Sequence, residues 1–92
     1  MDEYLDQLSY EILGYVSNDY EPYDRIVIEL STQNPRPTKD QIDAAIVRLS
    51  DQGLIRAYHL SAFKPHVTEV NVRECAIEKT YFYVTHEGKA QL

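Results

Sequence analysis

The sequence has little of what many specialised small proteins depend on: one cysteine, no tryptophan and three glycines. A single thiol, Cys75, cannot build an internal disulfide framework, which favours a reducing, intracellular setting. No apolar run approaches the roughly 20 residues that a membrane helix needs. The segment MDEYLDQLSYEIL at the start is acidic and lacks the basic and apolar regions of a signal peptide. We therefore expect a soluble, cytoplasmic protein that does not associate with membranes.

Basic residues are also scarce. The 92 residues include nine basic and 15 acidic ones, for a net charge of −6. Residues 1–34 hold eight acidic residues and one basic residue, whereas residues 35–92 hold eight basic and seven acidic residues. This balance excludes the broad basic footprint of a nonspecific nucleic-acid binder and leaves only local basic contacts. The length and the hydrophobic fraction of 43% predict a single domain, residues 1–92, with one thin core.

The residue types that carry catalytic and metal chemistry are scattered. None of the three histidines, His59, His66 and His86, forms a metal-type pair with another histidine or with Cys75. A zinc site made from Cys75 and two histidines would need the fold to bring them together. There is no phosphate-cradling glycine loop and no nucleophile elbow. Cys75 lies in a strand-like run, which favours a buried side chain over a nucleophile. We expect no enzyme activity, no metal and no cofactor.

Two helices are predicted in the first third of the chain. Apolar residues recur there at three- and four-residue spacing: Leu5, Leu8, Ile12, Leu13 and Val16. That spacing predicts an amphipathic helix, which residues 18–22 end. A second helix is expected from Pro22 or Tyr23 through YDRIVIELS, because proline is tolerated in a first helical turn. The β-branched residues of this segment leave a strand as the alternative.

The third predicted helix has the clearest boundaries. The prolines of the turn TQNPRP forbid helix continuation before it. Thr38 and Gln41 then have the spacing of a capping box, in which each side chain caps the other residue's N–H. The buried stripe is expected to be Ile42, Ala45, Ile46 and Leu49. Gly53 suits the left-handed residue that follows a helix, and Leu54 suits the apolar contact after it.

Strands are expected in the second half. LIRAYHLSAF alternates apolar and polar residues, which predicts a strand, and TYFYVT is the strongest strand signal in the chain. VNVRECAI between them reads as a strand or as a short helix. THEGKAQL predicts a short terminal helix with Thr85 as its N-cap, weakened by Gly88. The region between Phe63 and Lys79 is long, so an extra strand or helical turn is expected there.

Two segments resemble a known family. DQIDAAIVRLSDQGLIRAY looks like the third helix and first wing strand of MarR- and PadR-type transcriptional regulators. YFYVTHEGKAQL looks like their returning wing strand and the start of the final helix. The resemblance implies an α+β fold of the small winged-helix type. Such a fold has a three-helix helix-turn-helix core, a β-hairpin wing and a short C-terminal helix.

The resemblance also implies binding to double-stranded DNA, with the third helix in the major groove. On a helical wheel, Gln41, Ala44 and Arg48 form one outward line, in which the polar residues suit base edges and Ala44 allows close approach. Arg36 and Thr38 are expected to touch phosphate. Basic residues of a wing lie over phosphates or the minor groove, which would give that role to Lys64 and Arg73. Two aspartates of the helix also point away from the core, and they would repel the phosphate backbone: Asp40 and Asp51.

A protein-interaction module without DNA binding is the alternative function. Five of the eight tyrosines lie in the acidic first quarter of the chain, and tyrosine is enriched at interface cores. Tyr4, Tyr10 and Tyr15 would form an acidic, tyrosine-rich face on the first helix. Val47 is an apolar residue that the helical wheel places outward, as a contact for a protein partner would be. The partner would be a second copy of the chain, in a homodimer, or another protein.

Overall fold

The structure is a computed structural model, which describes residues 6–60 and 67–92. Over these residues it has four α-helices and one four-stranded antiparallel sheet, which confirms the α+β class. The helices are α1 (Gln7–Tyr15), α2 (Tyr23–Leu30), α3 (Lys39–Asp51) and α4 (His86–Lys89). The strands are β1 (Glu21–Pro22), β2 (Ile55–Leu60), β3 (Val67–Val70) and β4 (Tyr81–Val84). Two 3₁₀ turns, η1 (Val72–Glu74) and η2 (Ile77–Lys79), lie between β3 and β4.

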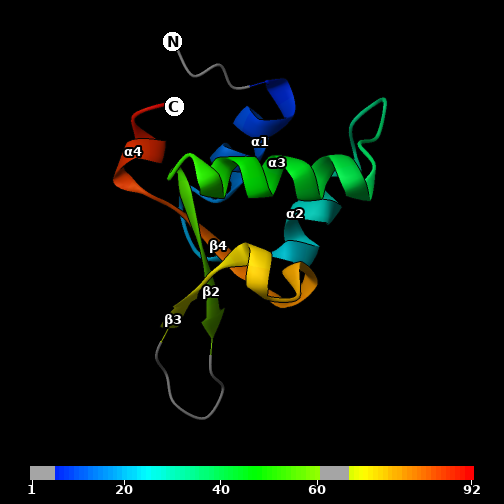
Figure 1. Ribbon diagram of the computed structural model, residues 1–92. Helices are drawn as coiled ribbons and strands as arrows, with labels where there is room; N and C mark the ends of the chain where they lie inside the picture. The colour runs from blue at the N-terminus through cyan, green and yellow to red at the C-terminus, as the bar shows by residue number, and fades with distance from the viewer. Residues whose placement is uncertain (1–5, 61–66) are drawn as a thin grey trace.

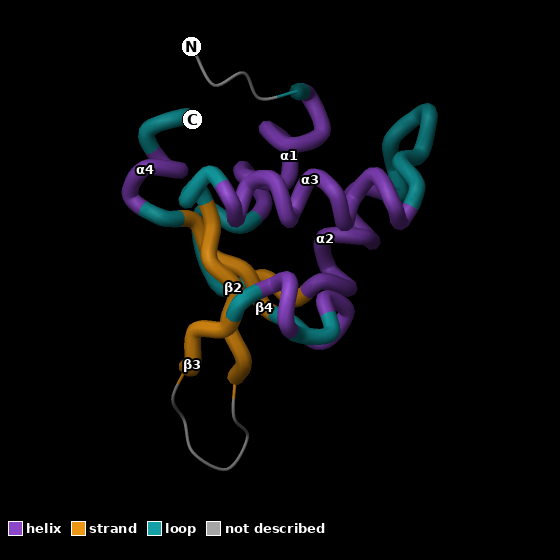
Figure 2. The backbone as a smooth tube through the Cα atoms, in the orientation of Figure 1, coloured by secondary structure: helices purple, strands orange, loops and turns teal. Residues whose placement is uncertain are grey.

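Helices α1 and α3 lie at one end of the molecule, and the β2–β3 hairpin projects away from them (Figures 1 and 2). The strand order is β1-β4-β2-β3, so β2 has β3 on one side and β4 on the other. Strand β4, from TYFYVT, therefore returns antiparallel to β2, as predicted. The hairpin partner of β2 is β3, which lies in the long region between Phe63 and Lys79 where an extra strand or helical turn was expected. Both kinds of element are present there, since η1 and η2 follow β3. Within VNVRECAI the short-helix alternative is correct for Val72–Glu74, and only Val70 belongs to a strand.

The core lies between the helices and the inner face of the sheet. Alternation along β2 and β4 directs one set of side chains inward, where all are at most 5% exposed: Ile55, Ala57, Phe82 and Val84. The predicted stripe of α3 meets them, with Ile42 3% exposed and Ala45, Ile46 and Leu49 fully buried. Helix α1 packs against α3 and contributes Ile12, Leu13 and Val16. Leu5 of the predicted first stripe lies outside the described residues.

Both ends of α3 are capped as the sequence predicts. The Thr38 hydroxyl accepts from the Gln41 N–H at 3.1 Å, and the Gln41 side chain accepts from the Thr38 N–H at 2.9 Å. At the other end Gly53 adopts φ 73°, and the Leu54 N–H donates to the Leu49 carbonyl at 3.0 Å. These bonds form a Schellman motif, which satisfies carbonyls that the helix leaves without partners. The first and last residues of α3 are thus set by local sequence signals.

The segment YDRIVIELS is helical, so the strand alternative is wrong there. Helix α2 begins at Tyr23 after Pro22, as predicted, because proline supplies a suitable φ where no N–H bond is needed. The two residues before it, Glu21 and Pro22, pair with β4 as the edge strand β1, which the sequence did not reveal. The longest helix of the described residues, α3, has 13 residues, and no helix there is long and apolar enough to cross a membrane.

Helix α4 and its N-cap pack against the turn that follows α3. The Thr85 side chain caps α4 by accepting from the Gly88 N–H, and its hydroxyl donates to the Gly53 carbonyl at 2.7 Å. Gly88 itself is buried against this turn. A Cβ placed on Gly88 would lie 2.1 Å from the Leu54 carbonyl oxygen and 2.7 Å from a Val84 methyl carbon. The close approach of α4 therefore requires glycine at this position.

The first prediction compares two glycines. Gly88→Ala should lower the free energy of unfolding by at least about 2 kcal/mol, because backbone must move to admit the methyl group. Gly14→Ala in α1 is the matched control, since its Cβ would meet nothing within 4 Å. It should stabilise the protein by about 0.5–1 kcal/mol through helix propensity. Urea unfolding measures both, and a neutral Gly88→Ala would contradict the close packing of α4.

Candidate functional site

The predicted DNA-contacting residues that the structure describes gather on the outward side of α3. We call this region the α3 surface and define it by six residues: Arg36, Thr38, Gln41, Ala44, Arg48 and Arg73. One groove, between α1, the α2–α3 turn and α3, is lined by the first five of them. A second groove, between α3 and η1, is lined by Ala44, Arg48 and Arg73. Because Ala44 and Arg48 line both grooves, the two form one continuous surface. The seventh predicted residue, Lys64, lies outside the described residues.

The side chains at the start of α3 are partly committed to the capping box. It uses the Thr38 hydroxyl oxygen and the Gln41 amide oxygen as acceptors. No hydrogen bond within residues 6–60 and 67–92 involves the Gln41 amide nitrogen, which is a donor on an exposed side chain. Gln41 can therefore donate to an acceptor outside the protein without loss of its cap. Ala44 beside it is exposed and leaves the helix backbone accessible.

Arg48 makes an ion pair with a residue from the start of the described chain. Its Nη2 lies 3.1 Å from Oδ2 of Asp6, 42 positions away. Asp6 uses its other oxygen, Oδ1, to accept from the Ser9 N–H at 2.8 Å as the N-cap of α1. The Ser9 backbone N–H, with Arg48 as a smaller cause, lowers the pKa of Asp6. The carboxylate therefore stays ionised beside Arg48 at neutral pH.

Arg73 makes a second ion pair, with Asp51 at the last residue of α3. The Arg73 Nε donates to Asp51 Oδ1 at 3.2 Å, and the Arg73 Nη2 contacts the other carboxylate oxygen. This two-bond contact lowers the pKa of Asp51 and raises the pKa of Arg73. It also places Arg73 in η1 against α3. Arg73 therefore lies beside α3 and not on the projecting hairpin, where a wing residue was expected.

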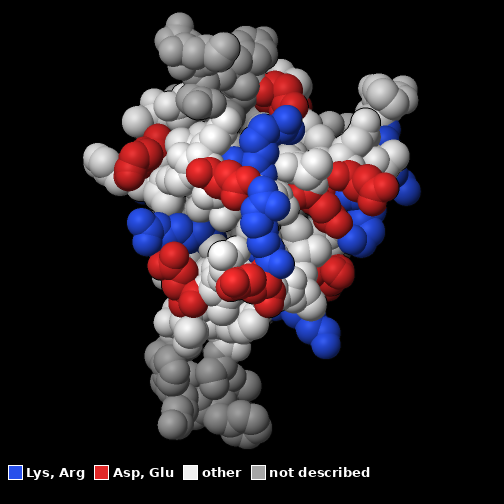
Figure 3. All heavy atoms as spheres, viewed as in Figure 1, with Lys and Arg blue, Asp and Glu red and all other residues white. Residues whose placement is uncertain are grey.

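The charges of the residues that line the two grooves cancel. A narrow column of basic atoms crosses the face that carries α3, with acidic atoms on both sides (Figure 3). The residues that line the two grooves include three arginines and three aspartates. Arg36 is exposed and has no ion-pair partner among the residues that the structure describes. The surface thus offers directional donors without a strong positive field.

Asp43, the other aspartate of α3 that lines a groove, has a structural role. Its Oδ1 accepts from the buried Tyr23 hydroxyl at 2.7 Å, and its Oδ2 lies 2.6 Å from the Lys39 ammonium. The same ammonium lies 5.7 Å from the centre of the Tyr23 ring. These contacts join the first turn of α2 to the first half of α3. They fix the angle between the two helices and hence the orientation of the α3 surface.

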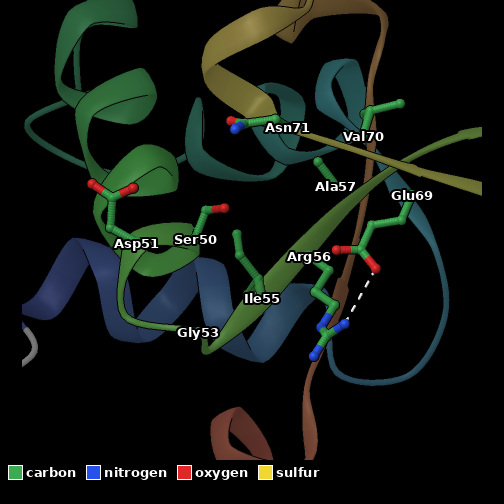
Figure 4. A pocket seen from close by; sticks show the side chains of 9 residues that line it. All are labelled: Ser50, Asp51, Gly53, Ile55, Arg56, Ala57, Glu69, Val70 and Asn71. Atoms are coloured by element: carbon green, nitrogen blue, oxygen red, sulfur yellow. Dashed lines mark hydrogen bonds and ion pairs between the residues drawn. The ribbon is translucent and has the colours of Figure 1, made fainter.

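A third groove lies at the root of the hairpin, between the end of α3 and strands β2 and β3 (Figure 4). Asp51 and Ser50 approach it from α3, and Asn71 lies above it at the start of η1. On the opposite side Arg56 and Glu69 pair with each other at 3.2 Å. Its charged side chains are thus engaged in ion pairs, Asp51 with Arg73 and Arg56 with Glu69.

The tyrosines predicted to form an interaction face do not gather on α1. Tyr10 is 44% exposed, but Tyr15 is half-buried and packs against the core. Val47 is also half-buried and packs against the core, beside the groove that Arg73 lines. It is therefore less exposed than the helical wheel suggested. Tyr4 lies outside the described residues.

The tyrosines gather instead on the outer face of the sheet. Tyr58 of β2 pairs with Tyr81 of β4, and both alternate with core residues, so they point outward. Tyr83 has the same orientation, and Tyr20 packs on Tyr58 and Tyr83 with ring centres 5.2 and 5.0 Å apart. We call these four residues the tyrosine face. Sequence alternation in β2 and β4 could have located three of them, but Tyr20 arrives from a turn.

The metal-binding residue types are dispersed over the part of the chain that the structure describes. In residues 6–60 and 67–92 no three side chains among His, Cys, Asp and Glu could share a metal ion. Cys75 is half-buried after η1 and not within a strand. Its sulfur lies 3.4 Å from the Thr80 hydroxyl and 3.8 Å from the Val72 carbonyl. It therefore helps to join η1 to the start of β4.

Comparison with models of protein families, with curated proteins and with solved structures finds no match to this chain.

The second prediction tests the bond that orients α3. Tyr23→Phe should lower the free energy of unfolding by about 1–2 kcal/mol at pH 7, because Asp43 loses a donor. Tyr10→Phe, on an exposed ring, should change nothing measurable.

The same pair of variants has a pH signature. Burial, together with the hydrogen bond to Asp43, raises the pKa of Tyr23. Above the ordinary tyrosine pKa of about 10 the unfolded chain loses this proton while the folded chain keeps it. The stabilisation by Tyr23 is therefore complete below that pH and is lost as the pH rises. Urea unfolding between pH 8 and 11 should show the difference between wild type and Tyr23→Phe shrinking; a constant difference would contradict this.

Proposed function

We propose that this protein is a winged-helix DNA-binding domain of the transcription-regulator type. In this arrangement α2 and α3 form the helix-turn-helix, α3 enters the major groove, and the β2–β3 hairpin is the wing. One observation carries the proposal. Five of the six residues of the α3 surface line one groove: Arg36 and Thr38 come from the turn and N-cap before α3, and Gln41, Ala44 and Arg48 lie along one exposed side of the helix.

The chemistry of this surface suits base edges. Arginine binds guanine through two parallel hydrogen bonds, and glutamine donates to acceptors of the bases. Arg48 and the free amide nitrogen of Gln41 lie on either side of Ala44, whose small side chain admits a base edge or a thymine methyl group. Arg36, at the start of the surface, suits a phosphate contact, which positions a protein without reading sequence.

The two ion pairs do not prevent such contacts. The side chains of Arg48 and Asp6 are both 51% exposed, and those of Arg73 and Asp51 are 59% and 50% exposed. Exposed ion pairs contribute only about 0–1 kcal/mol to stability. A good two-bond contact to a base contributes about 1–3 kcal/mol of discrimination. DNA can therefore displace the aspartates at low cost.

The third prediction tests this function by random-site selection at low salt, followed by binding measurements on the enriched duplex. Arg48→Ala should relax the preference at one base position, with a loss of about 1–3 kcal/mol. Arg36→Ala should weaken binding to all sequences alike and reduce the slope of log K against log [salt] by about 0.9. Arg25→Ala on α2 is the control, because Arg25 is exposed and lines neither groove. No enriched sequence from a folded protein would overturn the proposal.

A second candidate function, a protein-interaction module, is favoured by the tyrosine face. The rings of this face continue into Leu60 and Val67, which form a cross-strand pair and are each 40% exposed. Arg56 and Glu69 lie beside them with opposite charges. Arg56 and Glu69 pair within one chain at 3.2 Å, and a two-fold axis close to them would allow them to pair between two copies instead. We propose a second copy of this chain as the partner, because the face is complementary to itself.

The fourth prediction concerns that self-association. If the tyrosine face joins two copies, Leu60→Ser should weaken dimerisation about tenfold in sedimentation equilibrium, because it removes apolar area from the contact. Ile28→Ser on α2 is the matched control, since Ile28 is 56% exposed and lies outside the sheet. A protein that remains monomeric at high micromolar concentration would exclude the self-associating module.

A further inference from the structure

Both arginines of the α3 surface that hold partners are neutralised by carboxylates from distant parts of the chain. Asp6 is 42 positions from Arg48, and Asp51 is 22 positions from Arg73. The fold thus brings Asp6 to Arg48 and brings Arg73 to Asp51 of α3, so each arginine meets an acidic group on the surface proposed to approach an acidic polymer. Bound phosphate or a base edge would have to displace them.

Helix stability alone does not explain why Asp6 lies beside Arg48 or why Asp51 lies beside Arg73. Asp6 caps α1 through Oδ1, which leaves Oδ2 for Arg48. Asp51 is the last residue of α3, where the helix dipole disfavours negative charge. Exposed pairs of this kind contribute little to folding. Their effect is therefore larger on what the two arginines can bind than on the stability of the fold.

We propose that Asp6 and Asp51 determine specificity by guarding Arg48 and Arg73 against nonspecific DNA; this inference rests on the proposed DNA-binding function. A phosphate offers an arginine much the same chemistry as a carboxylate does. Exchange of Asp6 for a phosphate therefore gains little, and the carboxylate then lies close to a like charge. A correctly placed guanine gives Arg48 two directional bonds that bulk DNA does not, so only the specific site compensates for the displacement.

The experiment compares Asp6→Asn and Asp51→Asn, singly and together, with wild type. Asparagine keeps an acceptor for the α1 cap at position 6 but cannot form an ion pair. Asp24→Asn is the charge-matched control, because Asp24 is exposed on α2 and lines neither groove of the α3 surface. The probes are a labelled duplex of the sequence enriched by wild type and a random-sequence duplex of equal length. Each is titrated at several salt concentrations, and circular dichroism verifies folding.

The Asp6→Asn and Asp51→Asn variants, which we call the guard variants, should each bind the random duplex about three- to tenfold more tightly. Each variant removes one ion pair between an aspartate and an arginine, and one repulsion between the aspartate and a phosphate. The salt slope for the random duplex should steepen by about 0.9 for each arginine released to a phosphate. Affinity for the enriched duplex should rise less, so the ratio of specific to nonspecific affinity should fall at least about threefold in each variant.

Two other outcomes overturn the inference in distinguishable ways. If the guard variants change both affinities no more than Asp24→Asn does, the guard role is wrong and the DNA-binding proposal stands. If neither wild type nor any variant binds either duplex at low salt, the DNA-binding proposal fails and the guard role fails with it.

Discussion

The packing of one stripe of α3 against α1 and the sheet is the constraint on which the other features depend. Four apolar side chains of α3 are at most 3% exposed, which allows the helix only one rotation about its axis. That rotation decides which residues face outward, and so it places Gln41, Ala44 and Arg48 together. The caps at both ends and the Tyr23–Asp43 bond then fix where the helix starts, stops and points. The burial of the apolar stripe of α3 therefore determines which polar side chains of the helix are exposed.

Polar groups on this surface are divided between internal and external use. In the capping box Gln41 uses its oxygen and retains its nitrogen, and Asp6 divides its two oxygens between a backbone N–H and an arginine. Asp43 is fully engaged by Tyr23 and Lys39. Aspartates that look equivalent in the sequence therefore have different roles. Asp43 links α2 to α3, whereas Asp6 and Asp51 form ion pairs with arginines that remain exposed to solvent.

Much of the helical part of the fold could be predicted from the sequence, because its signals are local. The capping box, the i, i+3, i+4 stripe and Gly53 act within a few residues of one another, and all three are confirmed. Strand β1 was missed because its pairing depends on β4, far away in the chain. An extra strand was expected in the region that holds β3, but the bounds of β3 were not predicted, because they depend on its pairing with β2. Val67–Val70 carries few apolar residues to mark it as a strand, and its position at a sheet edge leaves it largely exposed.

The placement of the candidate residues of α3 along one side of the helix was predictable, but their ion pairs were not. A helical wheel finds Gln41, Ala44 and Arg48 because they share one element. It cannot find Asp6 or the approach of η1, since both depend on how separate elements pack. The same limit applies to the tyrosines, whose number was visible but whose common surface depends on the register of β2 with β4 and on a turn that brings in Tyr20.

The net charge of −6 is a poor guide to whether this chain binds DNA. At physiological salt, charges separated by more than about 8 Å are largely screened, so the groups within a few ångströms of α3 decide the contact. Among the acidic residues of the first third that the structure describes, Asp6 alone lines either groove. Because Asp6 lies 3.1 Å from Arg48, its influence on that arginine exceeds that of the distant carboxylates. For the proposed DNA contact, the relevant quantity is the local balance of three arginines against three aspartates, two of which lie in exposed ion pairs.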